Sequence, residues 1–296
     1  MAFETKATIA TFGGQLLKLT HNSTSTKTPM AVSVFLPPSS STSPVPVLLY
    51  LSGLTCTPDN CTEKGFLHAA ASQRGIAVVY PDTSPRGAGV EGEDESYDFG
   101  SGAGFYVDAT AAPWSDNYNM YSYVQKELLP LLFADNDDNP ILGGKLDASR
   151  VSIAGHSMGG HGALTLYLKN PGFYKSVSAF SPVCNPSKSP WGEKAFAGYL
   201  GADRAAWASH DATALVAGEG WQGADLKALV DVGTADNFYK QGQLLPENFE
   251  AAARGNGVTG LTVRYQEGYD HSYYFISTFA KDHVEHAAKY LLLLLL

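Results

Sequence analysis

The sequence has few cysteines, few charged residues and no long hydrophobic run. Of its 296 residues, 17% are charged and three are cysteine, at Cys56, Cys61 and Cys184. Three cysteines are too few, and odd in number, for a disulfide scaffold in a chain of this length, so we expect a reducing compartment. The opening residues MAFETK lack the basic stretch and apolar core of a secretory signal. We therefore expect a cytoplasmic protein.

Positive charge is also scarce. The chain has 20 Lys and Arg against 29 Asp and Glu, a formal net charge of −9, and its basic residues do not cluster. This argues against a nucleic-acid partner and against an anionic membrane surface, because both depend on concentrated positive charge. The leucine run at residues 291–296 is far shorter than the roughly 20 apolar residues that span a bilayer, so no membrane partner is expected. This tail could extend the last helix, cover a hydrophobic patch or be incidental to function.

What is present is the pattern of one α/β domain, which we predict over residues 1–290. Hydrophobic residues make up 44% of the chain, enough for a substantial core. The apolar runs Val47–Leu51 and Ile76–Tyr80 are typical of parallel strands buried on both faces. Other expected strands lie at Thr8–Thr20, Met30–Leu36, Val151–Ala154, Ser176–Phe180, Ala228–Gly233 and Leu261–Gln266. Expected helices lie at Gly65–Arg74, Met120–Phe133, Gly160–Asn170, Glu247–Arg254 and Ser272–Tyr290. The alternation predicts a mostly parallel sheet flanked by helices.

A serine between small residues follows one of these strands. The string GHSMGG at residues 155–160 comes directly after Val151–Ala154 and precedes a helical pattern. The chain has 30 glycines, which make chance matches common, but this context is typical of a nucleophile elbow, a tight turn that presents a reactive side chain. We predict that Ser157 is the nucleophile and that the Met158 amide, at the start of the helix, stabilises an oxyanion. His156 is expected to point away from the cleft and shape the elbow, and it is an alternative general base.

A second glycine-rich segment spans Asp98–Phe105. A dinucleotide-binding loop directly follows a strand and opens a helix, and this segment does neither, so no cofactor is expected. We predict that the surrounding stretch, residues 91–112, is a loop over the cleft. Residues 184–201 are interpreted as another long connection carried by the sheet.

A serine nucleophile needs a base and an acid that orients the base. In α/β hydrolases these residues follow in the order Ser, acid, His. Asp236 lies just past the strand Ala228–Gly233, and His271 follows the strand Leu261–Gln266. Both positions are carboxyl ends of parallel strands, where sites in open α/β sheets gather. We therefore predict Ser157, Asp236 and His271 as a catalytic triad.

Other acids and histidines fit these roles less well. Asp231 lies within or before its strand, and Asp225 is expected to precede a helix. His210 lies in an irregular excursion, and His283 and His286 lie at helical spacing on a face that we expect to be exposed. The last two lack an acidic third ligand in a recognised pattern, so no metal site is expected.

Several longer strings resemble one known family. The resemblance runs from about Phe3 to Tyr290, and the string GYDHSYYF, which begins at Gly268, is far more specific than the elbow alone. The matching segments are residues 51–57, 80–87, 100–110, 155–160, 180–182, 242–246 and 266–275. They are similar to those of S-formylglutathione hydrolase, also called esterase D, an α/β hydrolase. Only the leucine tail departs visibly.

The resemblance implies a cytosolic, homodimeric serine hydrolase. Its reaction would be hydrolysis of the thioester S-formylglutathione to glutathione and formate, the step after formaldehyde is oxidised as its glutathione adduct, with further activity on small esters. The family pattern implies the same triad, Ser157, Asp236 and His271. It also implies an oxyanion hole built from the backbone amides of Leu54 and Met158.

Three more residues are assigned roles beside this site. Cys56 stands where the family keeps a cysteine near the active site. We interpret it as a neighbour that blocks access when it is modified, with simple packing as the alternative. Because both glutathione and the chain are net negative, local cations must favour the encounter, and Lys64 and Arg86 are the candidates for substrate binding.

Two other functions compete with this one. A general carboxylesterase or acyltransferase would use the same elbow, triad and oxyanion loop. A binding protein that has lost catalysis would lack one triad member, and here all three are present.

Overall fold

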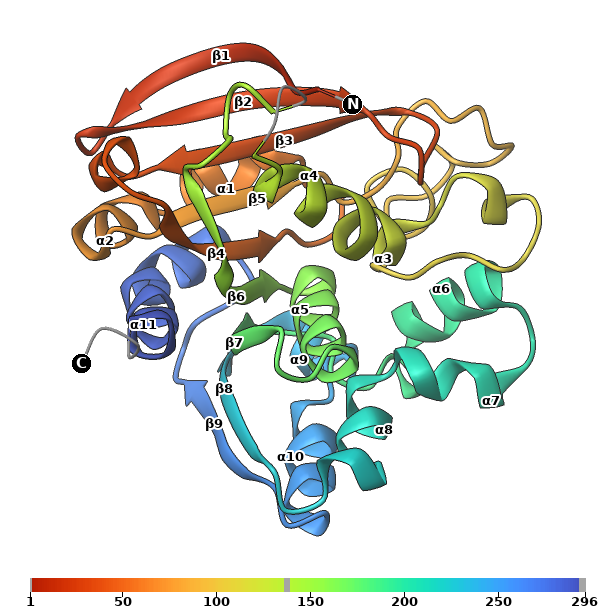
Figure 1. The fold of residues 1–296 in the computed structure, drawn as a ribbon. Coiled ribbons are helices and arrows are strands. Elements are labelled where there is room, and N and C mark those ends of the chain that lie inside the picture. Colours follow the sequence, from red (N-terminus) through yellow and green to blue (C-terminus); the bar gives the residue numbers. More distant parts are fainter. Residues whose placement is uncertain (1, 136–138, 293–296) are drawn as a thin grey trace.

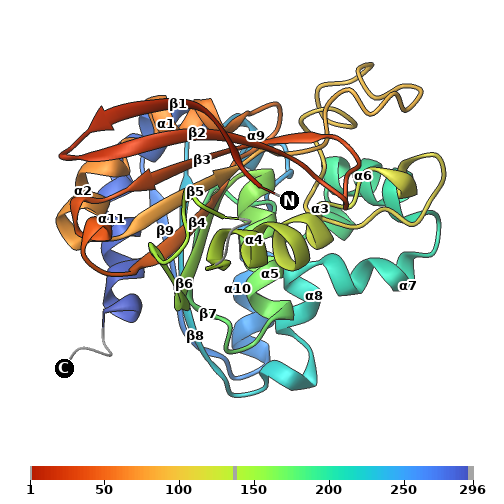
Figure 2. The same cartoon turned by 45° about the horizontal axis from the view of Figure 1, so that its top comes forward.

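Nine strands form one twisted sheet in the computed structural model, which describes residues 2–135 and 139–292 (Figure 1). Their order across the sheet is β1-β2-β3-β5-β4-β6-β7-β8-β9. The strands β4 to β9 run parallel, whereas β1, β2 and β3 are antiparallel to their neighbours and form one end of the sheet (Figure 2). The strands are β1 (Glu4–Thr11), β2 (Gly14–Asn22), β3 (Pro29–Leu36), β4 (Val45–Leu51), β5 (Ala77–Pro81), β6 (Leu146–His156), β7 (Tyr174–Phe180), β8 (Asp225–Gly233) and β9 (Thr259–Gln266). The expected α/β-hydrolase fold class is confirmed.

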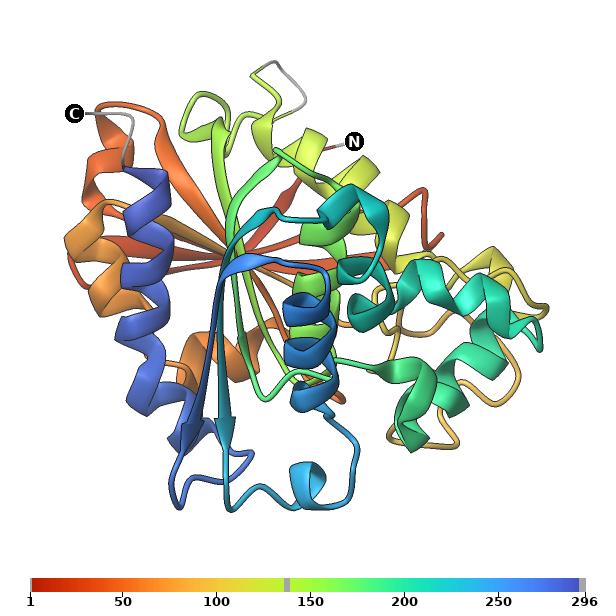
Figure 3. The same ribbon diagram turned by 90° about the horizontal axis from the view of Figure 1, so that it is seen from below.

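Helices cover both faces of the sheet, with α11 on one face and α5 and α10 on the other (Figure 3). The α-helices are α1 (Pro58–Lys64), α2 (His68–Arg74), α3 (Met120–Ser122), α4 (Leu129–Phe133), α5 (Met158–Lys169), α6 (Pro190–Leu200), α7 (Arg204–Trp207), α8 (Ala212–Val216), α9 (Asn237–Lys240), α10 (Pro246–Gly255) and α11 (Tyr273–Leu291). A π-helical segment spans Tyr123–Leu128, and single 3-10 turns lie at Pro38–Ser41, Trp114–Asp116, Pro186–Lys188, Ala208–His210 and Glu219–Trp221. No helix in the described part of the chain is long and apolar enough to cross a membrane.

The central strand β4 explains why the apolar runs in the sequence are continuous. All seven of its residues are buried, and alternate side chains point to opposite faces of the sheet. Leu48 and Tyr50 pack on the side of α2 and α11, whereas Val47, Leu49 and Leu51 belong to the core on the side of α5. A strand with helices on both faces needs apolar residues at every position.

One predicted helix is interrupted in the structure, and another is continuous but not α-helical throughout. The expected helix Gly65–Arg74 is wrong in its first turn, because α1 ends at Lys64 and Phe66 adopts a positive φ of 58° before α2 begins. Gly65 packs closely on α1, since a Cβ there would lie 2.5 Å from Cys61 Sγ. The expected helix Met120–Phe133 is helical over its full range, with a π-helical segment between α3 and α4. Pro130, in the first turn of α4, has no amide hydrogen to donate to the preceding turn.

The last helix extends one residue into the predicted leucine tail. Leu291 ends α11 and is fully buried in the core beside α2. Leu292 packs against the same cluster. The rest of the tail, residues 293–296, lies outside the described residues.

Four of the rejected candidates, two aspartates and two histidines, lie in or against β8. Asp231 is within the strand, as expected, but Asp225 begins the same strand and does not precede a helix. The expectation that His283 lies on an exposed face is wrong, because its side chain is buried and stacks on Phe180 with ring centroids 3.5 Å apart. Helical spacing puts it in the apolar stripe of α11 that faces the sheet, and its Nε2 lies 3.0 Å from Asp231 Oδ2. His286 lies 3.1 Å from the Lys227 carbonyl oxygen.

Neither histidine belongs to a group of metal-ligating side chains. Across residues 2–135 and 139–292, no three His, Cys, Asp or Glu residues are placed together to hold a metal ion.

A buried ion pair at Asp231 stabilises this side of the sheet. Arg264 Nε donates to Asp231 Oδ1 over 2.6 Å, and Arg264 Nη2 lies 2.5 Å from Oδ2. Burial alone would raise the pKa of Asp231, but the hydrogen bonds from His283 and Arg264 outweigh it and lower the pKa to about 2. The carboxylate therefore stabilises the fold above its unfolded pKa of about 4, and this contribution is lost as the pH falls toward about 2.

We expect Asp231→Asn to lower the free energy of unfolding by about 2 to 4 kcal/mol at pH 7, because Arg264 and His283 lose their anionic partner. Urea unfolding of the wild type and the variant at a series of pH values measures this. The difference between the two proteins should shrink as the pH falls below about 4. A difference that is constant with pH would contradict the ionised role of Asp231.

Candidate active site

Ser157 sits at a sharp turn between β6, which ends at His156, and α5, which begins at Met158. Its backbone has φ 58° and ψ −120°, a conformation that a residue with a side chain rarely adopts. The turn is possible because small residues flank it. A Cβ at Gly155 would lie 2.1 Å from the Gly159 carbonyl oxygen, and one at Gly159 would lie 2.0 Å from the carbonyl oxygen of Leu51. The predicted strand, elbow and helix are therefore present. Gly155 and Gly159 allow the close backbone contacts that the sharp turn requires.

His271 and Asp236 lie on two loops at the same edge of the sheet. Asp236 follows β8 and His271 follows β9, and His271 Nδ1 lies 2.5 Å from Asp236 Oδ2. The other carboxylate oxygen, Oδ1, accepts the backbone N–H groups of Phe238 (2.8 Å) and Tyr239 (3.3 Å) at the start of α9. Asp236 is fully buried. The first turn of α9 thus holds the carboxylate in one orientation, with one oxygen directed at the histidine.

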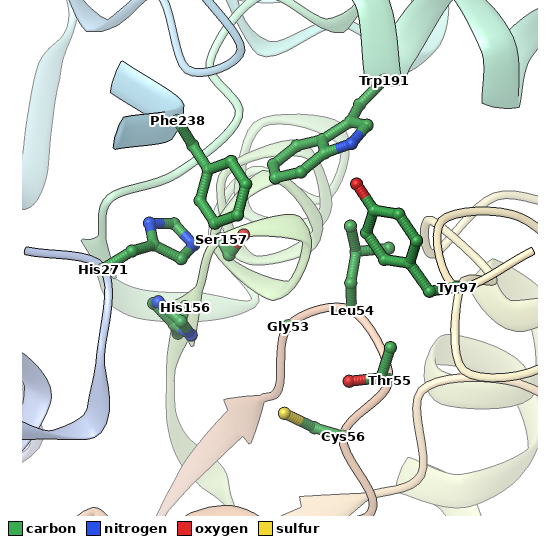
Figure 4. A pocket seen from close by; sticks show the side chains of 10 residues that line it. All are labelled: Gly53, Leu54, Thr55, Cys56, Tyr97, His156, Ser157, Trp191, Phe238 and His271. Atoms are coloured by element: carbon green, nitrogen blue, oxygen red, sulfur yellow. The ribbon is translucent and has the colours of Figure 1, made fainter. Parts of the chain in front are cut away.

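Two rings pack against the imidazole of His271. Phe238 meets it edge-on, with centroids 4.8 Å apart, and His156 lies on its other side at 4.5 Å. His156 was expected to point away from the cleft, but it lines the same cavity as Ser157 (Figure 4). Burial, with a further contribution from the neighbouring His271, lowers the pKa of His156 well below its usual value. His156 is therefore neutral, and it supports the ring of His271 by packing.

Ser157, His156 and His271 line a single cavity of about 190 Å³. Figure 4 shows Ser157 between His271 on one side and the aromatic side chains of Trp191 and Tyr97 on the other. The lining residues are Gly53, Leu54, Thr55, Cys56, Tyr97, His156, Ser157, Trp191, Phe238 and His271. Tyr97, Trp191 and Phe238 are not among the site residues predicted from the sequence. The first two lie in the segments interpreted as long connections, and the position of Tyr97 agrees with the expected loop over the cleft.

The residues predicted to form an oxyanion hole are Leu54, in the loop after β4, and Met158, at the start of α5. Leu54 lines the cavity. Met158 is the first residue of α5, and the first amides of a helix have no carbonyl partner within it, which favours a negative charge there. Gly53 keeps the approach open, because a Cβ on it would lie 3.1 Å from Ser157 Cβ. The oxyanion role of the two amides stays a prediction.

The other predicted site residues are not all in the cavity. Cys56 lines it, and burial raises the pKa of its thiol, whose Sγ lies 3.8 Å from Tyr273 Oη. Arg86 does not line the cavity: its Nε lies 3.0 Å from Asp82 Oδ2, and its Nη2 donates to the carbonyl oxygen of Cys56 over 3.0 Å. Lys64 lines a different cavity beside Tyr273. The predicted substrate contacts of Arg86 and Lys64 and the blocking role of Cys56 therefore stay predictions.

Known proteins match this chain over nearly its whole length. A family model described as putative esterase matches residues 23–286. S-formylglutathione hydrolase of Bos taurus is 52% identical over 291 residues, covering 98% of this chain and 99% of the relative. The protein of the same name from Rattus norvegicus is 51% identical over 280 residues, or 95% of both chains. The solved structure of an S-formylglutathione hydrolase from Agrobacterium tumefaciens has a TM-score of 0.90 and 46% identity, covering 98% of this chain and 100% of the other.

Proposed function

This chain belongs to the S-formylglutathione hydrolase family, and we propose that it hydrolyses the thioester of S-formylglutathione to glutathione and formate. One observation carries the proposal: in a member of this family that matches its relatives over nearly their whole length, an elbow serine and a histidine paired with a buried aspartate line one small cavity. The reaction consumes the product of an oxidation of the glutathione adduct of formaldehyde. Family membership also leads us to propose a homodimer in the cytoplasm, and a solution mass of twice the chain mass would support the dimer.

The first half of the reaction forms an acyl enzyme. His271 Nε2 takes the proton of the Ser157 hydroxyl as Ser157 Oγ attacks the formyl carbon. Asp236 accepts the Nδ1–H of His271, which keeps Nε2 free to accept that proton and stabilises the imidazolium that forms. The carbonyl oxygen gains negative charge and binds the amides of Leu54 and Met158. The carbon–sulfur bond then breaks, and glutathione leaves as the thiol with the proton from His271.

The second half returns the enzyme to its starting state. His271 removes a proton from water as the water oxygen attacks the formyl group on Ser157. The same two amides stabilise the second tetrahedral intermediate. Ser157 leaves with the proton from His271, and formate is released. No redox step occurs, so the residues of this chain and one water balance the reaction.

The size of the cavity fits this substrate at its acyl end. A formyl group is a single carbon with one oxygen, and 190 Å³ holds it together with the adjoining thioester. A tripeptide is larger than the remaining space, so most of the glutathione moiety lies outside the cavity. Specificity for small acyl groups therefore follows from the aromatic walls that Tyr97, Trp191 and Phe238 provide.

The lining of the cavity favours one alternative, a general carboxylesterase for small esters. Among the described lining residues there is no lysine or arginine, so the cavity itself offers no positive side chain to the carboxylates of glutathione. Its aromatic walls suit an uncharged aryl ester equally well.

The two functions are separated by comparing kcat/KM for S-formylglutathione, S-lactoylglutathione and p-nitrophenyl acetate. We expect the formyl thioester to be preferred over both other substrates by roughly 10- to 200-fold, because a larger acyl group in a tight pocket costs roughly one to three kcal/mol. S-lactoylglutathione is the control for glutathione binding, since only its acyl group differs. An aryl ester that is hydrolysed as well as the formyl thioester would show a broad esterase instead.

A further inference from the structure

Two consecutive buried aromatic residues near the active site have strained backbones. Phe105 and Tyr106 have φ values of 47° and 51°, in the left-handed region that residues with side chains avoid. Both side chains are buried. They belong to the segment Gly100–Thr110, to which the proposed reaction assigns no role. Such a conformation persists only where surrounding contacts hold it, and at functional sites it often fixes the position of a neighbouring group.

Helix α5 holds this strained pair. His161 Nε2 lies 3.0 Å from the carbonyl oxygen of Phe105. Burial lowers the pKa of His161 to about 4, so its ring is neutral at pH 7 and carries one proton. Because a carbonyl oxygen can only accept, that proton is on Nε2. Gly162 lies against the ring of Tyr106, where a Cβ would be 2.5 Å from Tyr106 Cδ2.

The same pair reaches the loop after β4, which carries Leu54. Tyr106 Oη donates a hydrogen bond of 2.9 Å to the carbonyl oxygen of Ser52, two residues before Leu54. On the other side of Leu54, the amide of Thr55 donates to the carbonyl oxygen of Gly102 over 2.8 Å. Segment 102–106 therefore binds the backbone on both sides of Leu54. Figure 4 shows Gly53, Leu54 and Thr55 along one wall of the cavity that contains Ser157.

We propose that Tyr106 and His161 are positioning residues that set the distance between the two halves of the oxyanion hole. One half, the Met158 amide, is at the start of helix α5. His161, one turn later in the same helix, donates a hydrogen bond to the carbonyl oxygen of Phe105 in the strained pair. The other half, the Leu54 amide, is tied to the pair through the Tyr106 hydroxyl and Ser52. The link fixes the two amides relative to each other before the substrate binds. This inference rests on the serine mechanism proposed above, but not on glutathione as the leaving group.

Tyr106→Phe tests the link, since it keeps the ring and removes only the hydroxyl. We expect kcat for p-nitrophenyl acetate to fall about tenfold, less than the loss of a whole oxyanion donor, with KM nearly unchanged. The affinity for an aryl trifluoromethyl ketone, whose adduct with Ser157 mimics the tetrahedral oxyanion, should fall by the same factor. The pH midpoint of kcat/KM should not move, because His271 and Asp236 are untouched. Tyr174→Phe is the matched control, since its hydroxyl donates to Gln125 Oε1 over 2.7 Å, away from the cavity.

Two variants of His161 give an independent test. In His161→Gln the side-chain amide can still donate to the Phe105 carbonyl, whereas His161→Phe cannot. The glutamine variant should keep more ketone affinity and more kcat per folded enzyme than the phenylalanine variant. If Tyr106→Phe fails to fold, the difference between His161→Gln and His161→Phe tests the positioning role on its own.

The proposal is overturned if the Tyr106 variant, or the phenylalanine variant at position 161, keeps kcat and ketone affinity within twofold of the wild type. It is also overturned if the losses match those of Tyr174→Phe. The aryl ester reports on the oxyanion hole by itself. If the wild-type enzyme did not hydrolyse S-formylglutathione, the proposed substrate would be wrong, but the tests of Tyr106 and His161 would still apply.

Discussion

Ser157→Ala is expected to lower kcat for both S-formylglutathione and p-nitrophenyl acetate by about 10⁴-fold or more, because no other group in the cavity can form the acyl enzyme. Alanine has the same Cβ as serine, so the strain at φ 58° is retained and the free energy of unfolding should change little. The loss then reports on the hydroxyl alone. With p-nitrophenyl acetate in excess, the wild type should release a burst of p-nitrophenol near one equivalent per active site, and the variant should release none.

Cys56→Ala is the discriminating variant for this prediction. Cys56 lines the same cavity, but burial raises the pKa of its thiol, and a thiol is a much weaker nucleophile than a thiolate. We expect its kcat to fall less than about tenfold, the range of a packing change beside the site. If Cys56→Ala lost the burst of p-nitrophenol and Ser157→Ala kept it, Cys56 would be the nucleophile in place of Ser157.

The arrangement of the site could be predicted from the sequence to the extent that it depends on local pattern. The elbow needs small residues at fixed offsets from Ser157, and these can be read directly. Asp236 and His271 could be placed together because each follows an apolar run, and the carboxyl ends of parallel strands share one edge of a sheet. The structure brings Nδ1 of the histidine within 2.5 Å of the aspartate.

What could not be predicted depends on how loops and helices pack. Tyr97 and Trp191 reach the cavity from segments with no strand or motif to place them. His283 shows a second limit: the spacing of α11 gives the face on which it lies but not that this face meets the sheet, where Asp231 supplies its partner. His156 shows a third, because the direction of its side chain depends on the strained turn that follows it.

Asp236→Asn should lower kcat by about 10⁴-fold, as expected for a base held in the wrong tautomer. The reason lies in the two backbone amides of α9 that donate to Oδ1, from Phe238 and Tyr239. They need an acceptor, so the asparagine must present its carbonyl oxygen to them and its NH₂ group to His271. Nδ1 of His271 must then accept, and its proton moves to Nε2. A protonated Nε2 cannot take the proton of Ser157.

Asp231→Asn is the matched control, because it makes the same change in a second Asp–His pair whose aspartate is buried. Asp231 on β8 binds His283 of α11 and Arg264 of β9, and none of these residues lines the cavity, so its loss should appear as reduced stability with kcat per folded enzyme largely retained. The Asp236 variant should show the opposite: it keeps its bonds to α9, so unfolding in urea changes little while turnover is lost. Both variants should be assayed with p-nitrophenyl acetate and normalised to the folded fraction. If turnover were lost in the Asp231 variant and kept in the Asp236 variant, Asp231 would have to replace Asp236 as the acid, and the strand-end argument that selected Asp236 would be wrong.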